Sequence, residues 1–222
     1  VVLFLSTAPK IAAFALFYRL LIDAFASISE TWTVMIYALG MLSLIIGNLI
    51  AISQNNFKRL LGYSAIGHIG FIFLGISTGT QDGLESSLFY VLIYVLMTMV
   101  AFMVIEVLSS KHHEVKLLKD LKDLNSSHPW FSLIMLITMC SMIGIPPFAG
   151  FYAKWSILSS LIEANMVYTA IIAILMTVIA AFYYLRVIWF IYFEKTDKEI
   201  GQPDSKIVQK AVVSFTGITI LL

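Results

Sequence analysis

Long apolar blocks separated by short polar connections make up most of this chain. A bilayer core is about 30 Å thick and needs about 20 mostly apolar residues in a helix to cross it. The blocks are apolar on all sides of the helix, which is typical of spans rather than of amphipathic surface helices. The predicted spans are 1–22, 32–53, 60–77, 84–108, 130–162, 167–193 and a seventh that opens near Val208. The pattern therefore predicts an all-α, polytopic transmembrane helical bundle of about seven spans.

The polar connections alternate in charge, and this alternation predicts how the spans are oriented. Ten of the fourteen lysines and arginines lie in every second connection. They are Lys58, Arg59, Lys111, Lys116, Lys119, Lys122, Lys195, Lys198, Lys206 and Lys210. The intervening connections carry the carboxylates Asp23, Glu30, Asp82, Glu85 and Glu163. The positive-inside rule places the basic connections in the cytoplasm or the mitochondrial matrix.

Composition excludes several classes of protein. Hydrophobic residues make up 60% of the chain and charged residues 12%, against about 45–50% and about 25% in ordinary soluble domains. A net charge of +1 gives no basic surface for nucleic acid. The single cysteine, Cys140, excludes a disulfide framework and a multi-cysteine metal site. The sequence opens and closes inside apolar runs, so we expect residues 1–222 to be one membrane domain, truncated at both ends, of a larger protein.

Three ionisable residues are predicted to lie near the middle of the bilayer. At 1.5 Å per helical residue, Lys10 lies roughly 13 Å deeper than the arginine that ends its span, and His68 lies roughly 15 Å in from the basic end of its own. Lys154 is the only charge in the span 130–162. A lysine at the centre of a membrane helix costs about 2.5–3.5 kcal/mol, and such residues usually line a polar pathway. A packing role is an open alternative for His68, whereas the two lysines favour function.

The span 130–162 is too long for one straight helix, and it contains the sequence Gly-Ile-Pro-Pro-Phe-Ala-Gly at 144–150. Tandem prolines remove two backbone donors and glycines permit an unwound turn, so we expect a broken helix that lines a cavity. Lys154 is then predicted in the first turn of the second half-helix. The positive end of that helix's dipole disfavours an ammonium, which favours a lysine that can release its proton.

Two weaker patterns each permit a simpler interpretation. Leu117, Leu118, Leu121 and Leu124 alternate with lysines, which predicts either an amphipathic segment on the membrane surface or a solvated connector. Tyr183, Tyr184 and Arg186 lie toward the basic end of their span, where aromatic and arginine anchors are usual.

Three stretches of the chain resemble the antiporter-like subunits of respiratory complex I. Residues 6–12, Ser-Thr-Ala-Pro-Lys-Ile-Ala, are similar to the lysine-bearing helix of that family. Residues 47–49 and 56–70, which end in Ser-Ala-Ile-Gly-His-Ile-Gly, resemble its most diagnostic stretch. Residues 144–154 resemble its broken helix. Among the three paralogous subunits, the sequence Phe-Tyr-Tyr-Leu-Arg-Val at 182–187 is most similar to subunit N, called subunit 2 in mitochondria.

The resemblance implies the C-terminal part of a 14-helix antiporter-like fold and a proton-translocating subunit of NADH:quinone oxidoreductase. In such a subunit Lys10 would connect to the other half-channel, His68 would relay along the central polar axis, and Lys154 would be the terminal exchange site. No cofactor would bind to this chain. NADH, FMN, iron–sulfur clusters and quinone would bind to partner subunits.

The resemblance also implies partners and a location. The partners would be other complex I membrane subunits, including paralogous antiporter-like subunits, in a mitochondrial inner membrane or a bacterial plasma membrane. The glutamate–lysine pair of the family's first half-channel is absent from these residues, so either further residues or a separate chain would supply it. Two alternatives are a sodium/proton antiporter subunit of the multi-subunit exchanger type and a structural scaffold. The cost of three ionisable residues at membrane depth argues against the scaffold.

Overall fold

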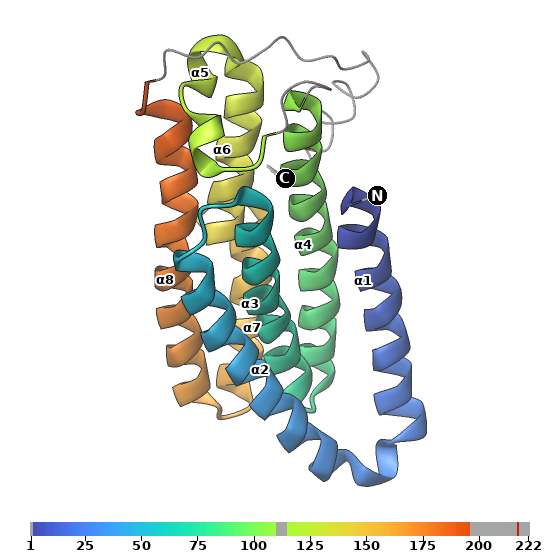
Figure 1. Ribbon diagram of the computed structural model, residues 1–222. Coiled ribbons are helices and arrows are strands. Elements are labelled where there is room, and N and C mark those ends of the chain that lie inside the picture. The colour runs from blue at the N-terminus through green and yellow to red at the C-terminus, as the bar shows by residue number, and fades with distance from the viewer. Residues whose placement is uncertain (1, 110–114, 196–216, 218–222) are drawn as a thin grey trace.

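The computed structural model describes residues 2–109, 115–195 and 217, which form helices and one isolated β-bridge. In chain order the elements are α1 (Val2–Arg19), a π-helical turn η1 (Leu20–Ala24), a 3₁₀ turn η2 (Ala26–Ile28), α2 (Ser29–Ile52), α3 (Phe57–Ser77), α4 (Gln81–Leu108), a 3₁₀ turn η3 (Leu118–Leu121), α5 (Leu124–Ser127), α6 (Pro129–Ile143), α7 (Ala149–Glu163) and α8 (Val167–Tyr192). The long helices run side by side along one direction (Figure 1). The prediction of an all-α helical bundle is confirmed.

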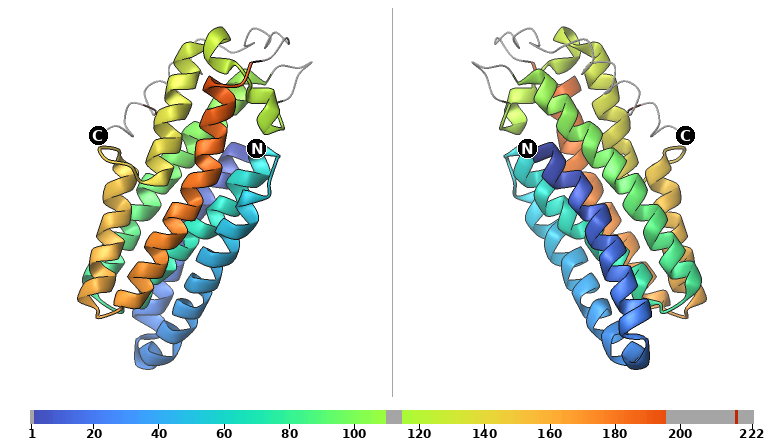
Figure 2. Two further views of the ribbon diagram at one scale, coloured as in Figure 1. Left: turned by 90° about the vertical axis from the view of Figure 1, so that its left-hand side faces the viewer. Right: turned by 90° about the vertical axis from the view of Figure 1, so that its right-hand side faces the viewer.

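Within the part of the chain that the structure describes, four helices are each long and apolar enough to cross a membrane, namely α2, α3, α4 and α8. Helix α1 and the stacked pair α6–α7 run beside them along the same axis (Figure 2). Each of the first six predicted spans corresponds to one of these helices or to the α6–α7 pair. The seventh, which opens near Val208, lies outside the described residues.

The two ends of the bundle differ in charge, as the sequence predicts. The turns α3–α4 and α7–α8 lie at the lower end in Figure 1. Asp82 and Glu85 lie beside the first of these turns, at the start of α4, and Glu163 ends α7. The segment 115–128 lies at the upper end, and the α2–α3 connection lies beneath it, where the backbone of Leu118 donates to the carbonyl of Asn55 at 2.9 Å. Their basic residues, among the described part of the chain, are Lys58, Arg59, Lys116, Lys119 and Lys122. The side of the membrane that each end faces stays a prediction.

Glycines bring α2 and α3 into close contact. A Cβ atom on Gly47 of α2 would lie 2.6 Å from the backbone nitrogen of Gly67 in α3, a distance that real Cβ atoms do not adopt. A Cβ on Gly70 would lie equally close, at 2.6 Å, to the backbone nitrogen of Leu44. Only hydrogen atoms fit at these positions, so the backbones touch. This contact fixes the rotation of α3, and with it the direction in which His68 points.

The segment 115–128 covers the upper end of the bundle. The backbone of Phe57 donates to the carbonyl of Lys116 at 2.9 Å, which ties the segment to the start of α3. The side chains of Leu118, Leu121 and Leu124 are buried against the helices of the chain. The prediction of a solvated connector is therefore wrong. The segment is amphipathic, with its apolar face packed on the helices of the protein, and its position at the membrane surface stays a prediction.

Candidate functional site

His68 in α3 lies at the centre of a group of tyrosines and is only 5% exposed. Its Nδ1 atom lies 2.8 Å from the hydroxyl of Tyr90 in α4, and its Nε2 atom lies 2.9 Å from the hydroxyl of Tyr184 in α8. The imidazole also stacks on the ring of Tyr94, with 4.5 Å between the ring centres. A neutral imidazole has one donor and one acceptor nitrogen. One tyrosine therefore accepts a hydrogen bond from the ring while the other donates to it.

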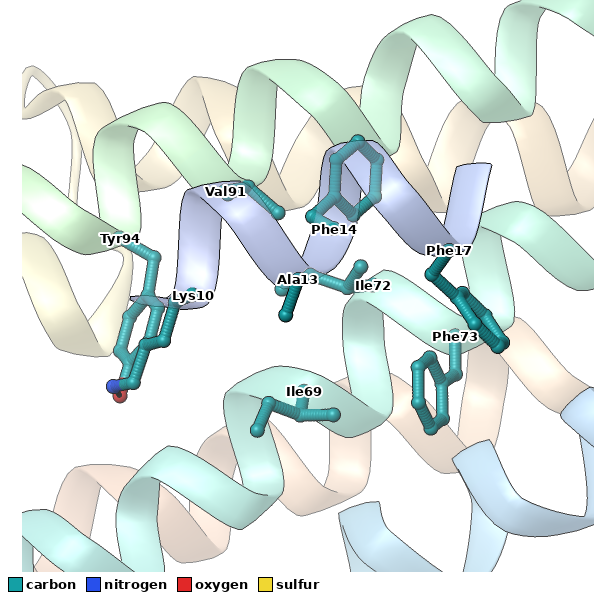
Figure 3. A pocket seen from close by; sticks show the side chains of 9 residues that line it. All are labelled: Lys10, Ala13, Phe14, Phe17, Ile69, Ile72, Phe73, Val91 and Tyr94. Carbon is teal, nitrogen blue, oxygen red and sulfur yellow. Dashed lines mark hydrogen bonds between the residues drawn. The ribbon is translucent and has the colours of Figure 1, made fainter. Parts of the chain in front are cut away.

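Lys10 in α1 reaches the same cluster through Tyr94. Its Nζ atom donates to the Tyr94 hydroxyl at 3.1 Å and lies 4.5 Å from the centre of that ring. Figure 3 shows the two polar atoms together at the edge of a cavity of about 270 Å³. The other walls of the cavity are apolar side chains, namely Ala13, Phe14, Phe17, Ile69, Ile72, Phe73 and Val91. The structure thus brings Lys10 and His68 together on either side of one tyrosine.

The helix that carries Lys154 is interrupted where the sequence predicts. Helix α6 ends at Ile143, and Gly144 follows in the left-handed conformation with φ of 90°. Helix α7 begins only at Ala149. The residues between them include both prolines, which cannot donate backbone hydrogen bonds to continue the helix. The predicted break between about Gly144 and Gly150 is confirmed.

Lys154 faces the interior and is 6% exposed. Its Nζ atom donates to the carbonyl oxygens of Met142 at 2.9 Å and Ile143 at 2.8 Å. The last carbonyls of a helix have no partner inside it and carry partial negative charge. The predicted contact of the ammonium with the positive end of α7 was therefore wrong. The residue lies in the second turn of α7, and its ammonium meets the negative end of α6 rather than the positive end of α7.

An aromatic ring separates Lys154 from the tyrosines. The Nζ atom of Lys154 lies 5.5 Å from the centre of the Phe71 ring, and that ring stacks on Tyr90 with 5.7 Å between centres. Tyr90 in turn binds the imidazole of His68. The three predicted residues therefore converge on one buried region, but the described contacts from Lys154 to His68 pass through the face of a phenylalanine. A polar axis bridged by water or hydroxyl groups along this part stays a prediction.

The interpretation of Tyr183 and Tyr184 as interfacial anchors is wrong. These side chains are 1% and 0% exposed, and they point into the bundle. Tyr183 donates to Oδ1 of Asn48 in α2 at 2.8 Å, while Tyr184 binds the buried imidazole. Arg186 lies nearer the end of α8 and donates to the carbonyl of Gln54 in the α2–α3 connection. The polar ends of both tyrosines are therefore satisfied by protein rather than by lipid headgroups.

Tyr90 and Tyr94 were not singled out from the sequence, although a signal for them exists. Four hydroxyl-bearing residues of the apolar helix α4 follow one another at intervals of three or four. They are Ser87, Tyr90, Tyr94 and Thr98, and all four are buried. Residues at this spacing share one face of a helix. A stripe of hydroxyl groups along a membrane span indicates a polar interface inside the bundle.

Within the described residues, no group of three or more histidine, cysteine, aspartate or glutamate side chains could hold a metal ion. The chemistry that these residues can perform is proton exchange. Two lysines and one histidine are linked to hydroxyl and carbonyl oxygens inside the bundle. None of the three forms a salt bridge with a carboxylate among the described residues.

Comparison with known proteins identifies related sequences and structures. A family model described as "NADH:quinone oxidoreductase/Mrp antiporter, TM" matches residues 1–180. The NADH-quinone oxidoreductase subunit N of Hydrogenovibrio crunogenus is 44% identical over 100% of this chain and 46% of its own length. A chain of respiratory complex I from Thermus thermophilus is 30% identical with a TM-score of 0.73, over 84% of this chain and 42% of its own.

The same fold occurs outside respiratory complexes. A chain of the Mrp complex from Dietzia sp. superposes with a TM-score of 0.82 over 95% of this chain and 47% of its own, at 19% identity. That likeness concerns the fold alone. The chain spans about half the length of the curated relatives that it matches.

Proposed function

Because the chain belongs to the NADH:quinone oxidoreductase/Mrp antiporter transmembrane family, we propose that it translocates protons as part of a subunit of an NADH:quinone oxidoreductase. The identity of 44% to a protein named subunit N supports this subunit among the paralogues. Residues 1–222 would act as one proton-translocating membrane domain. Protons would move through Lys10, His68 and Lys154, driven by quinone reduction elsewhere in the complex.

The observation that carries the proposal is the buried contact chain that begins at Lys10. The ammonium of Lys10 binds Tyr94, the Tyr94 ring stacks on His68, and both nitrogens of His68 bind hydroxyl groups. Lysine and histidine exchange protons, and the hydroxyl group of tyrosine both donates and accepts hydrogen bonds. Such residues are rare inside membranes because they are costly there, and they mark ion and proton pathways.

Lys154 has the surroundings of a group that gains and loses a proton. Removal from water disfavours its ammonium form. The carbonyl oxygens of Met142 and Ile143 at the end of α6 favour that same form. Two opposing influences on one buried group allow either protonation state to be reached when a neighbouring charge changes. This supports Lys154 as the exchange site of the domain.

Electron transfer would take place in partner subunits. FMN and iron–sulfur clusters would oxidise NADH there and deliver electrons to quinone, while this chain would contribute proton transfer without a cofactor of its own. Its partners would be the other membrane subunits of the complex, including paralogous antiporter-like subunits. The named relatives are bacterial, which favours a plasma membrane over a mitochondrial inner membrane.

Sodium/proton exchange is the second candidate, because the family description includes Mrp antiporters and the fold is shared with an Mrp chain. The respiratory function has the stronger support. Identity is 44% to the protein named subunit N and 19% to the Mrp chain. Proton pumping that persists without sodium ions would agree with the respiratory function.

The test is a Lys154→Ala substitution in the full-length subunit, assembled in the complete complex in membrane vesicles. We expect proton pumping and quinone reduction to fall, because the exchange site is gone. NADH oxidation by ferricyanide should be nearly unchanged, since it needs only the redox subunits. Quenching of an acridine dye reports pumping. Lys119→Ala, at an exposed lysine of the segment 115–128, is the matched control and should pump normally.

Lys154→Arg separates proton exchange from a fixed charge. Arginine keeps the positive charge beside the end of α6 but does not release its proton at accessible pH. We therefore expect Lys154→Arg to fail as badly as Lys154→Ala. Full pumping by the arginine variant, in complexes of normal subunit composition, would show that Lys154 is an electrostatic element and not a proton carrier.

A further inference from the structure

We propose that Tyr184, His68 and Tyr90 form one fixed proton wire across the bundle, in which the two tyrosine hydroxyls carry the proton into and out of the imidazole. This inference rests on the proposed function, in which His68 relays protons. It assigns a proton-carrying role to Tyr184, which the sequence pattern places among membrane anchors, and to Tyr90, to which that pattern gives no role.

The geometry leaves no other route into the imidazole among the described contacts. Both ring nitrogens are occupied, at 2.8 Å by the Tyr90 hydroxyl and at 2.9 Å by the Tyr184 hydroxyl. His68 is 5% exposed, while Tyr90 is 1% and Tyr184 0% exposed. A proton that reaches or leaves His68 therefore passes one of these two hydroxyl groups.

The wire runs laterally, from one helix to another, rather than along a single helix. Tyr184 belongs to α8, His68 to α3 and Tyr90 to α4. Figure 1 shows α8 and α4 on either side of α3. The two nitrogens of one imidazole thus connect α8 on one side of α3 with α4 on the other. A relay along the middle of the membrane must carry protons in this same direction, from helix to helix.

Each passage moves one proton in and one proton out. A proton that arrives at the Tyr184 oxygen displaces the hydroxyl's own proton to Nε2 of His68. The proton on Nδ1 then moves to the oxygen of Tyr90, whose own proton leaves on the far side. The imidazole is left neutral, as its other tautomer.

Aromatic contacts hold all three members of the wire in place. The His68 ring stacks on Tyr94 with 4.5 Å between centres. Tyr90 stacks on Phe71 at an interplanar angle of 13°, and the ring of Tyr184 lies 4.5 Å from that of Tyr183. These stacks keep the rings of Tyr90 and Tyr184 in place, and with them the hydroxyl oxygens beside the imidazole nitrogens.

The wire predicts an unusual order of severity among substitutions. Tyrosine to phenylalanine removes one oxygen atom and leaves a space smaller than the roughly 30 Å³ that a water molecule occupies in the liquid. Histidine to alanine removes a whole ring, and water can fill that larger polar space and carry protons. Removing a single hydroxyl should thus block the path more completely than removing His68 itself.

The experiment compares Tyr184→Phe, Tyr90→Phe and His68→Ala in the full-length subunit, within the complete complex in membrane vesicles. The matched control is Tyr183→Phe, which also removes one hydrogen-bonded hydroxyl from a buried tyrosine of α8 but does not touch the imidazole. Protons pumped per NADH oxidised are measured by dye quenching, and ferricyanide reduction and subunit content report assembly.

We expect Tyr184→Phe and Tyr90→Phe to lower pumping by about tenfold or more, in keeping with the loss of a positioned proton donor. His68→Ala should lower it less, and Tyr183→Phe should pump normally. The pumping rate of Tyr184→Phe and of Tyr90→Phe should also fall more in D₂O than that of the wild type, because proton transfer has become the slow step. A purely structural defect does not change the solvent isotope effect.

The outcomes that overturn the wire differ from those that overturn the relay. Normal pumping by Tyr184→Phe and Tyr90→Phe, or equal losses in Tyr184→Phe and Tyr183→Phe without an isotope effect, would exclude the tyrosines as carriers. Normal pumping by His68→Ala would instead remove His68 from the proposed function. If Tyr184→Phe fails to assemble, Tyr90→Phe tests the other end of the wire independently.

Discussion

Replacing Gly144 by alanine should displace Lys154 without removing it. Gly144 has φ of 90° at the end of α6, a conformation that side-chain-bearing residues rarely adopt. A Cβ atom there would lie 3.0 Å from Cδ of Lys154. Two carbon atoms are in ordinary contact at about 3.5–4.0 Å. The alanine variant therefore combines backbone strain with a push on the lysine side chain.

The size of each effect follows from these distances. The positive φ costs alanine about 1–2 kcal/mol of folding free energy. To restore normal contact, Cδ of Lys154 must move by roughly 0.5 Å or more. The hydrogen bonds of 2.8 and 2.9 Å from Nζ to the end of α6 would then exceed the roughly 3.2 Å limit of a good hydrogen bond. Because a 1 Å misplacement of a reacting group can cost about 100-fold, we expect pumping to fall by about tenfold.

Gly79→Ala is the matched control for this prediction. Gly79 also has a positive φ, of 68°, but nothing lies within 4 Å of the position its Cβ would take. Both variants should lower the temperature of heat inactivation of the assembled complex by a similar amount. Only Gly144→Ala should lower the number of protons pumped per NADH. Equal pumping by the two variants would refute the idea that Lys154 must hold its position at the end of α6.

Two further predictions concern packing. Gly47→Ala should prevent assembly of the subunit, because its Cβ would lie 2.6 Å from a backbone nitrogen of α3. Gly62→Ala, where nothing lies within 4 Å of the added Cβ, should assemble normally. The subunit content of purified complexes distinguishes the two variants, and normal assembly of both would contradict the close contact of α2 and α3. Leu121→Asp should detach the segment 115–128, since burying an unpaired carboxylate costs several kcal/mol. The control is Lys119→Asp, at an exposed site. A protease should cleave the segment faster in Leu121→Asp than in this control, and equal cleavage rates would place Leu121 outside the core.

The spans and the broken helix were predictable because each depends on local features of the sequence. Length and apolar composition determine whether a segment can cross a bilayer, whatever surrounds it. The two prolines interrupt a helix through their own geometry, and Gly144 supplies the positive φ at the break. The positions of Lys10, His68 and Lys154 inside spans follow from the number of helical residues that separate each of them from the end of its span.

The partners of those residues were not predictable, because they depend on how each helix is rotated in the bundle. Tyr183 and Tyr184 are adjacent in α8, yet one binds Asn48 and the other His68. The contact of Lys154 with the carbonyl oxygens of α6 needs the side chain to reach back across the break. A sequence places the lysine near a helix start but does not show which helix end its ammonium meets.

Tyrosines suit the surroundings of His68 better than carboxylates would. An aspartate or glutamate beside the imidazole would form a charge-assisted pair and hold the proton there. It would also add a second charge at membrane depth, where each is expensive. Two hydroxyl groups satisfy both ring nitrogens in either tautomer and in the protonated form, since a hydroxyl both donates and accepts. The cluster can therefore receive and release a proton without trapping it.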